Sequence, residues 1–129
     1  MYSVTKRMEV SSAHKLDLDY DSKCKNIHGH NWIIEVEVSA KELNKNGMVV
    51  DFSVISDIVK KLDHVYLNDR FSETNTTAEN MAKWIADSIT QHLEETADVA
   101  FPMNDKIFYA EVTKVTVQES KGNTACYIP

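Results

Sequence analysis

Histidines and one cysteine gather in a short stretch of this chain. Residues 24–30 read Cys-Lys-Asn-Ile-His-Gly-His, and a further histidine, His14, precedes them in Ser-Ser-Ala-His-Lys. Three imidazoles around a zinc ion leave one coordination position open for water or substrate, as catalytic zinc sites do. We therefore interpret His14, His28 and His30 as the ligands of a catalytic Zn²⁺ ion.

Cys24 has two possible roles beside these histidines. If three histidines hold the metal, the thiol is free to act as a base or a nucleophile. One cysteine with two histidines also makes an open catalytic site, so Cys24 could instead be the third ligand in place of His14. The spacing of the residues leaves both assignments open.

The size and composition of the chain limit the classes of protein it can belong to. Its 129 residues suffice for a single domain with a buried core, over 1–129. Because 20 acidic residues outnumber 14 Lys and Arg and no basic stripe occurs, we do not expect a nucleic-acid partner. No apolar run reaches about 20 residues and no signal peptide is recognisable, so we expect a cytoplasmic protein with no membrane partner.

Two predicted strands flank the histidine segment. Residues 2–10 are rich in apolar and β-branched side chains, and residues 31–39 alternate clearly between apolar and polar. One face of the second strand is made by Trp32, Ile34, Val36 and Val38. Side chains two apart in an extended chain point the same way, so His28 and His30 can bind one ion, with Gly29 leaving the backbone between them unobstructed.

The middle of the chain predicts a turn, an extended segment and a short helix. Residues 44–47, Asn-Lys-Asn-Gly, are typical of a turn, and residues 48–52 predict a short extended segment that could complete a hairpin. Ser53 is expected to cap a helix that ends just before Asp63 and His64. A charged pair at a helix end is common, and alone it indicates no function.

A longer helix and a closing hairpin are expected in the second half of the chain. Thr76 or Thr77 can cap this helix. Its buried face is expected to comprise Met81, Trp84, Ile85, Ser88, Ile89 and Leu93. Residues 98–105 predict a loop, and residues 106–118 and 124–128 predict two strands joined by a Lys-Gly-Asn turn.

Several segments occur in an order that resembles the 6-pyruvoyl-tetrahydropterin synthase family. They are Ser-Ser-Ala-His, Cys-x-x-x-His-Gly-His, Gly-Met-Val-Val-Asp-Phe, Leu-Asp-His-x-x-Leu-Asn-Asp, Asn-Thr-Thr-Ala-Glu-Asn and Val-Gln-Glu-Ser, and they span nearly all of the chain. The short gap between Cys24 and His28 is more similar to the bacterial 6-carboxy-5,6,7,8-tetrahydropterin synthase branch, which serves queuosine biosynthesis, than to the animal pyruvoyl enzymes, whose gap is longer.

This resemblance implies an α+β protein with the tunnelling fold, or T-fold. In that fold a four-stranded antiparallel sheet carries two helices on one face, and subunits join through their sheets into a β-barrel. Family members are typically homohexamers built as a dimer of trimers, with active sites at subunit contacts. The resemblance therefore implies a homohexameric lyase acting on a small pterin.

The resemblance also implies a role for each residue of the matching motifs. It assigns zinc binding to His14, His28 and His30, the catalytic base to Cys24 with its partners Asp63 and His64, pterin anchoring to Glu119, and positions near the substrate to Thr76, Thr77 and Glu79. From the residues alone, Glu119 would be an exposed carboxylate beside a hairpin turn. Only the whole pattern gives it a function.

The expected reaction converts 7,8-dihydroneopterin triphosphate to 6-carboxy-5,6,7,8-tetrahydropterin with release of acetaldehyde and triphosphate. Zinc would act as a Lewis acid on the side-chain hydroxyls of the substrate, and Cys24 would move protons. Three alternatives remain: a 6-pyruvoyl-tetrahydropterin synthase, a zinc hydrolase in which Cys24 is dispensable, and a noncatalytic zinc-stabilised oligomer.

Overall fold

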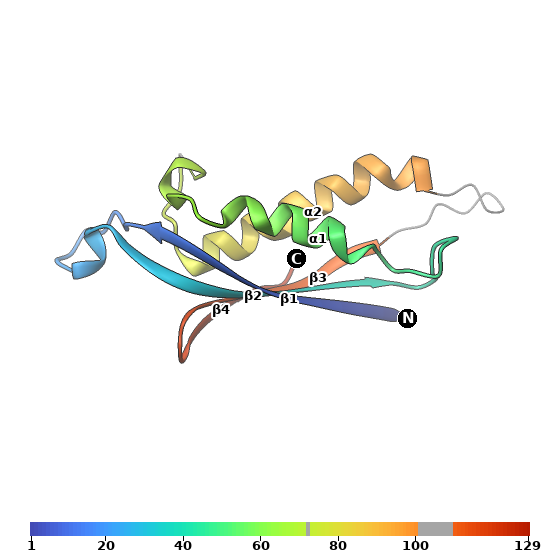
Figure 1. Ribbon diagram of the computed structural model, residues 1–129, viewed down its shortest axis with the longest axis horizontal. Helices are drawn as coiled ribbons and strands as arrows, with labels where there is room; N and C mark the ends of the chain where they lie inside the picture. The colour runs from blue at the N-terminus through green and yellow to red at the C-terminus, as the bar shows by residue number, and fades with distance from the viewer. Residues whose placement is uncertain (72, 101–109) are drawn as a thin grey trace.

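The computed structural model describes all residues except 72 and 101–109. Its strands form one antiparallel sheet in the order β1-β2-β3-β4. They are β1 (Tyr2–His14), β2 (His28–Ala40), β3 (Ala110–Ser120) and β4 (Asn123–Tyr127). The helices α1 (Phe52–Val59) and α2 (Ala78–Ala100) both cover one face of this sheet (Figure 1). The predicted α+β arrangement of four antiparallel strands and two helices is confirmed.

The core lies between the inner face of the sheet and the two helices. The four apolar side chains predicted to share one face of β2, from Trp32 to Val38, are all fully buried. Met81, Ile85 and Ile89 of α2 are also fully buried and belong to the same apolar cluster. Burying a large aliphatic or aromatic side chain stabilises a fold by roughly 1.5–3 kcal/mol, so this layer holds the sheet and the helices together.

The starts of the two helices test the predicted caps. Thr77 caps α2, because its Oγ1 accepts a hydrogen bond of 3.2 Å from the backbone N–H of Asn80. The prediction of Ser53 as the cap of α1 is wrong: Asp51 is the cap, and its Oδ1 accepts from the N–H of Ser53 at 2.8 Å. Helix α1 therefore begins two residues earlier than predicted, and the Asp51 carboxylate satisfies one free N–H of its first turn.

Some element bounds also differ from the predictions. Residues 48–51 form no strand, so the expected hairpin is absent there, although Val49 and Val50 are buried. Helix α2 extends to Ala100, so the first part of the predicted loop 98–105 is helical. The rest of that loop and the start of the predicted strand 106–118 lie outside the described residues.

Three short 3-10 turns complete the fold around one end of the sheet. They are η1 (Lys23–Lys25), η2 (Lys60–Leu62) and η3 (Leu67–Asp69). Strand β1 is longer than predicted and ends at His14, while β2 begins at His28, and these two residues are cross-strand partners. In the part of the chain that the structure describes, no helix combines the length and the apolar character needed to cross a lipid bilayer.

Candidate metal centre

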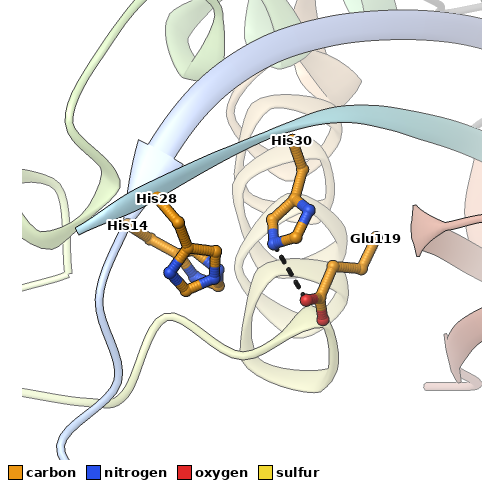
Figure 2. A group of neighbouring side chains, drawn as sticks. All are labelled: His14, His28, His30 and Glu119. Carbon is orange, nitrogen blue, oxygen red and sulfur yellow. Dashed lines mark ion pairs between the residues drawn. The ribbon is translucent and has the colours of Figure 1, made fainter. Parts of the chain in front are cut away.

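The ends of β1 and β2 bring three histidines onto one face of the sheet. His14 is the cross-strand partner of His28, and His30 lies two residues further along β2, opposite Ser12. The three imidazoles therefore project from the same face of two neighbouring strands. The ring centres are 4.5 Å apart for His14 and His28, 4.9 Å for His28 and His30, and 5.2 Å for His14 and His30. Figure 2 shows the three rings turned toward a common space.

Glu119 reaches the same space from β3. One nitrogen of each histidine and one carboxylate oxygen of Glu119 all lie within 4.8 Å of one another. The Glu119 Oε1 atom is 2.9 Å from His30 Nε2 (Figure 2). The end of β3 lies beside the beginning of β2 because the two strands are antiparallel, which places a hairpin carboxylate next to the histidines.

Backbone carbonyls orient two of the imidazoles. His14 Nδ1 lies 2.8 Å from the carbonyl oxygen of Thr76, and His28 Nδ1 lies 2.7 Å from that of Asn26. A carbonyl oxygen only accepts hydrogen bonds, so each Nδ1 carries the proton and donates. The lone pair of each ring is then on Nε2, the tautomer in which Nε2 can bind a metal.

Burial favours the neutral form of His14 and His30. The His14 side chain is fully buried, and burial lowers its pKa; the hydrogen bond to the Thr76 backbone opposes this effect, while His28 and His30 add to it. Burial also lowers the pKa of His30, against the raising effect of Glu119. A neutral imidazole offers a lone pair, and a cationic one does not, so these lowered pKa values favour metal binding.

Two nitrogens of this cluster are buried without a hydrogen bond. Among the described residues, neither His14 Nε2 nor His30 Nε2 has a hydrogen-bond partner, although Glu119 Oε1 makes an ion-pair contact of 2.9 Å with His30 Nε2. An unsatisfied buried polar atom costs about 1–3 kcal/mol. A Zn²⁺ ion fits this donor set, since zinc takes imidazole nitrogens and carboxylate oxygens as ligands.

Cys24 lies apart from this group of ligand atoms. It sits in η1, where its backbone N–H donates to Ser22 Oγ at 3.1 Å and its carbonyl accepts from the N–H of Leu16 at 2.9 Å. Its side chain is partly buried. In the described part of the chain, its sulfur does not belong to the group whose ligand atoms converge.

Asp63 and His64 pack against the outer edge of β1. Asp63 Oδ1 accepts a hydrogen bond of 2.8 Å from the N–H of Ser11, and the N–H of His64 donates to the Ser11 carbonyl at 2.7 Å. His64 has φ of 54°, a left-handed conformation that is uncommon for a residue other than glycine. Its side chain is 83% exposed, and its Nε2 is 3.8 Å from Asp63 Oδ2. No described hydrogen bond joins this pair to Cys24.

The residues expected near the substrate lie at the start of α2. Thr76 is fully buried, and its hydroxyl lies 3.2 Å from both His14 Nδ1 and the Lys15 carbonyl. Thr77 caps the helix, and Glu79 is exposed in the first turn. The structure thus brings Thr76 to the histidines, a contact that the sequence did not indicate.

The sequence of this chain matches those of known proteins. The family model described as 6-pyruvoyl tetrahydropterin synthase matches residues 3–129. A relative from Bacillus subtilis, named 6-carboxy-5,6,7,8-tetrahydropterin synthase, is 32% identical over 72% of this chain and 68% of its own length. A match with a Pyrococcus horikoshii protein is 55% identical, but it spans 43% of this chain and 35% of that protein.

The fold also matches solved structures. The structure of Caenorhabditis elegans 6-pyruvoyl tetrahydropterin synthase superimposes with a TM-score of 0.69 at 24% identity, over 99% of this chain and 95% of that one. At this identity the likeness supports the fold alone. Together with the sequence matches, it agrees with the tunnelling fold.

Proposed function

Because the chain belongs to the 6-pyruvoyl tetrahydropterin synthase family, we propose that it is a 6-carboxy-5,6,7,8-tetrahydropterin synthase. This enzyme would convert 7,8-dihydroneopterin triphosphate to the carboxylated tetrahydropterin and release acetaldehyde and triphosphate. Relatives from Bacillus subtilis, Haemophilus influenzae and Rickettsia conorii carry this name, which supports the choice of branch. The three-residue gap between Cys24 and His28 supports it as well. The product would serve queuosine biosynthesis in the cytoplasm.

The observation that carries the proposal is the cluster of three histidines, two of which, His14 and His30, bury an Nε2 atom that has no hydrogen-bond partner among the described residues. His14, His28 and His30 would hold a Zn²⁺ ion through Nε2 and leave one position open for the substrate. Zinc at this site would supply Lewis acidity toward the hydroxyl groups of the substrate side chain. If Glu119 were a fourth ligand, the site would be closed as structural zinc sites are, so we assign Glu119 to the substrate instead.

The protein groups would then divide the remaining tasks. The Cys24 thiol would take and return protons at the side-chain carbons of the substrate, which requires a base within hydrogen-bond reach. Asp63 would orient the imidazole of His64, which would in turn favour the thiolate of Cys24. The carboxylate of Glu119, 30% exposed, would accept two parallel N–H bonds from the guanidine-like edge of the pterin. Thr77 and Glu79 would lie along the same substrate.

We also propose that the active site is completed in a homohexamer. The imidazole of His64 is 83% exposed and no described hydrogen bond joins it to the Cys24 of its own chain. Strand β4 is the last of the sheet order, so its outer edge carries backbone groups available to another subunit. Pairing of sheets into a β-barrel would satisfy those groups and would bring His64 of one subunit toward a neighbour. Light scattering at working concentration tests this, and a fully active monomer would contradict it.

The direct test is to identify the products. Zinc-loaded protein is incubated with 7,8-dihydroneopterin triphosphate, and the products are identified by mass. We expect 6-carboxy-5,6,7,8-tetrahydropterin, acetaldehyde and triphosphate. A pyruvoyl pterin formed without acetaldehyde would move the chain to the other branch of the family, and absence of any turnover by zinc-loaded protein would contradict the enzymatic proposal.

A further inference from the structure

The outer edge of β1, away from β2, is paired with side chains and loops instead of another strand. Ser11 exchanges bonds with the Asp63 carboxylate and the His64 N–H, at 2.8 and 2.7 Å. Two residues further, the N–H of Ala13 donates to the Val65 carbonyl at 3.2 Å. The segment that follows η2 therefore runs along the edge of β1 toward the histidines.

Two asparagine side chains continue this pairing past His14. Asn68 Oδ1 accepts from the N–H of Lys15 at 3.0 Å, and its Nδ2 donates to the Lys15 carbonyl at 2.8 Å. Asn75 makes the same reciprocal pair with Asp17, with both distances 2.7 Å. A side-chain amide has one face with a donor and an acceptor, like a peptide group, so each asparagine replaces one residue of a neighbouring strand.

These asparagines connect directly to His14. Asn75 precedes Thr76, whose carbonyl oxygen accepts the hydrogen bond from His14 Nδ1. Asn68 is bonded to Lys15, which follows His14, and its Oδ1 lies 3.3 Å from the Thr76 hydroxyl. Asn80 Nδ2 donates to the Asn75 carbonyl at 2.9 Å and ties this group to α2.

We propose that Asn68 and Asn75 are positioning residues of the metal centre. By pairing with Lys15 and Asp17 they hold the chain after His14 at a set distance from Thr76, so that Nδ1 of His14 meets its carbonyl and Nε2 faces the other two histidines. The amides would contact neither metal nor substrate. This inference rests on the proposed zinc site.

The expected loss of zinc affinity can be judged from residues that orient metal ligands at other sites. Residues that orient a ligand from behind typically change metal affinity by about 10- to 100-fold when they are removed. Loss of either asparagine would leave the backbone of Lys15 or Asp17 to bond with water, and His14 would lose its orientation relative to Thr76. The other two imidazoles do not depend on these bonds.

The test compares zinc affinity in Asn68→Ala and Asn75→Ala with a matched control. Asn44→Ala also removes an amide that bonds to backbone, since Asn44 Oδ1 accepts from the N–H groups of Asn46 and Met48 at 2.9 and 3.0 Å in the loop before α1. Each protein is stripped of metal, checked by circular dichroism and titrated with zinc against a chromophoric chelator. We expect 10- to 100-fold weaker binding for Asn68→Ala and Asn75→Ala, and a change below about twofold for Asn44→Ala.

A second pair of variants decides the question if an asparagine variant does not fold. Thr76→Val removes the hydroxyl that bonds to Lys15 and Asn68 and lies 3.2 Å from His14 Nδ1, with little change of shape, and Thr76→Ser keeps it. We expect about tenfold weaker zinc binding for valine and near-parental binding for serine. Parental zinc affinity in the folded variants would overturn the inference while leaving the zinc site intact. If the parent itself bound no zinc, the proposed metal centre would fail instead.

Discussion

One end of the sheet buries imidazole nitrogens that have no hydrogen-bond partner among the described residues, and the other end has an apolar hollow. At the end where β1 finishes and β2 begins, His14 and His30 each bury a nitrogen that has no hydrogen-bond partner among the described residues. At the opposite end, a hollow of about 340 Å³ lies between the start of β1 and residues 43–52. Its lining includes Val4, Met48 and Phe52.

The comparison shows which kind of feature indicates a ligand in this molecule. Apolar side chains around an open hollow can be wetted at small cost, and singly exposed apolar residues are normal on a protein surface. A buried imidazole nitrogen without a partner costs about 1–3 kcal/mol, and a bound metal ion removes that cost. We therefore place the proposed function at the histidine end and not at the apolar hollow.

The largest expected effect is loss of zinc on removing a histidine. His28→Ala and His30→Ala should each fall from about one zinc per subunit toward none, because two imidazoles hold the metal much less tightly than three. Metal content of purified, folded protein by mass spectrometry measures this. Phe52→Ser, a change in the apolar hollow, should retain full zinc content and serves as the control. A full equivalent of zinc in both histidine variants would remove the ligand assignment.

The next effect is on turnover at constant zinc. Cys24→Ala should keep zinc and lose roughly 10²- to 10⁴-fold in kcat, the range over which general acid–base groups contribute. His64→Ala should also lose activity, and the double variant should be little worse than the worse single one, since residues that act as a unit are not additive. If the rate losses of the two single variants multiplied in the double variant, Cys24 and His64 would act independently. Near-parental activity of Cys24→Ala would favour a zinc hydrolase.

A smaller effect is expected in the pH dependence of stability without metal. Burial lowers the pKa of both His14 and His30 below the usual value of 6.5, so between the lowered pKa and 6.5 the unfolded chain binds more protons than the folded one. Stability is therefore full above about pH 6.5 and falls as the pH drops through 6.5 toward the lowered pKa values. The loss is larger the further burial lowers each pKa, since a tenfold change in a protonation equilibrium corresponds to about 1.4 kcal/mol.

Urea unfolding of the metal-free protein at several pH values between 5 and 8 measures this dependence. A His14→Asn, His30→Asn double variant should lose most of it. Metal-free parent protein that is as stable at pH 5.5 as at pH 7.5 would show that the two imidazoles are not held neutral by the fold.

The smallest effect is expected at the apolar end. Phe52 is 47% exposed, and Phe52→Ser should change the free energy of unfolding by no more than about 0.5 kcal/mol, as surface substitutions usually do. A thermal melt against the parent measures the change. A loss above about 2 kcal/mol would show that this hollow is part of the core, and the contrast between the two ends would weaken.

The regular elements of this fold were predictable because their periodicity is local. The alternation in β2 predicted its buried face, and the apolar stripe with a threonine cap at Thr76 or Thr77 predicted α2, which Thr77 caps. The cap of α1 was misassigned because Asp51 and Ser53 are both good capping residues two positions apart. The buried pair Val49 and Val50 suggested a strand, yet they fill the core from an irregular segment.

The candidate site was predictable in its ligand types but not in its surroundings. His-Gly-His at the start of a strand indicated two imidazoles on one face, and the structure has that arrangement. The contact of Glu119 with His30 depends on the pairing of β2 with β3, residues far apart in the sequence. The hydrogen bond of His14 to Thr76 likewise joins residues 62 positions apart, so no local sequence pattern predicts it.

The most direct test of the account is the identity of the atoms that bind zinc. X-ray absorption at the zinc edge of the loaded protein distinguishes nitrogen or oxygen ligands, at about 2.0–2.1 Å, from a thiolate at about 2.3 Å. We predict a shell of three imidazole nitrogens and one further light atom, with no sulfur, and the same spectrum for Cys24→Ala. A sulfur shell that disappears in Cys24→Ala would make Cys24 a ligand and would contradict its proposed role in moving protons.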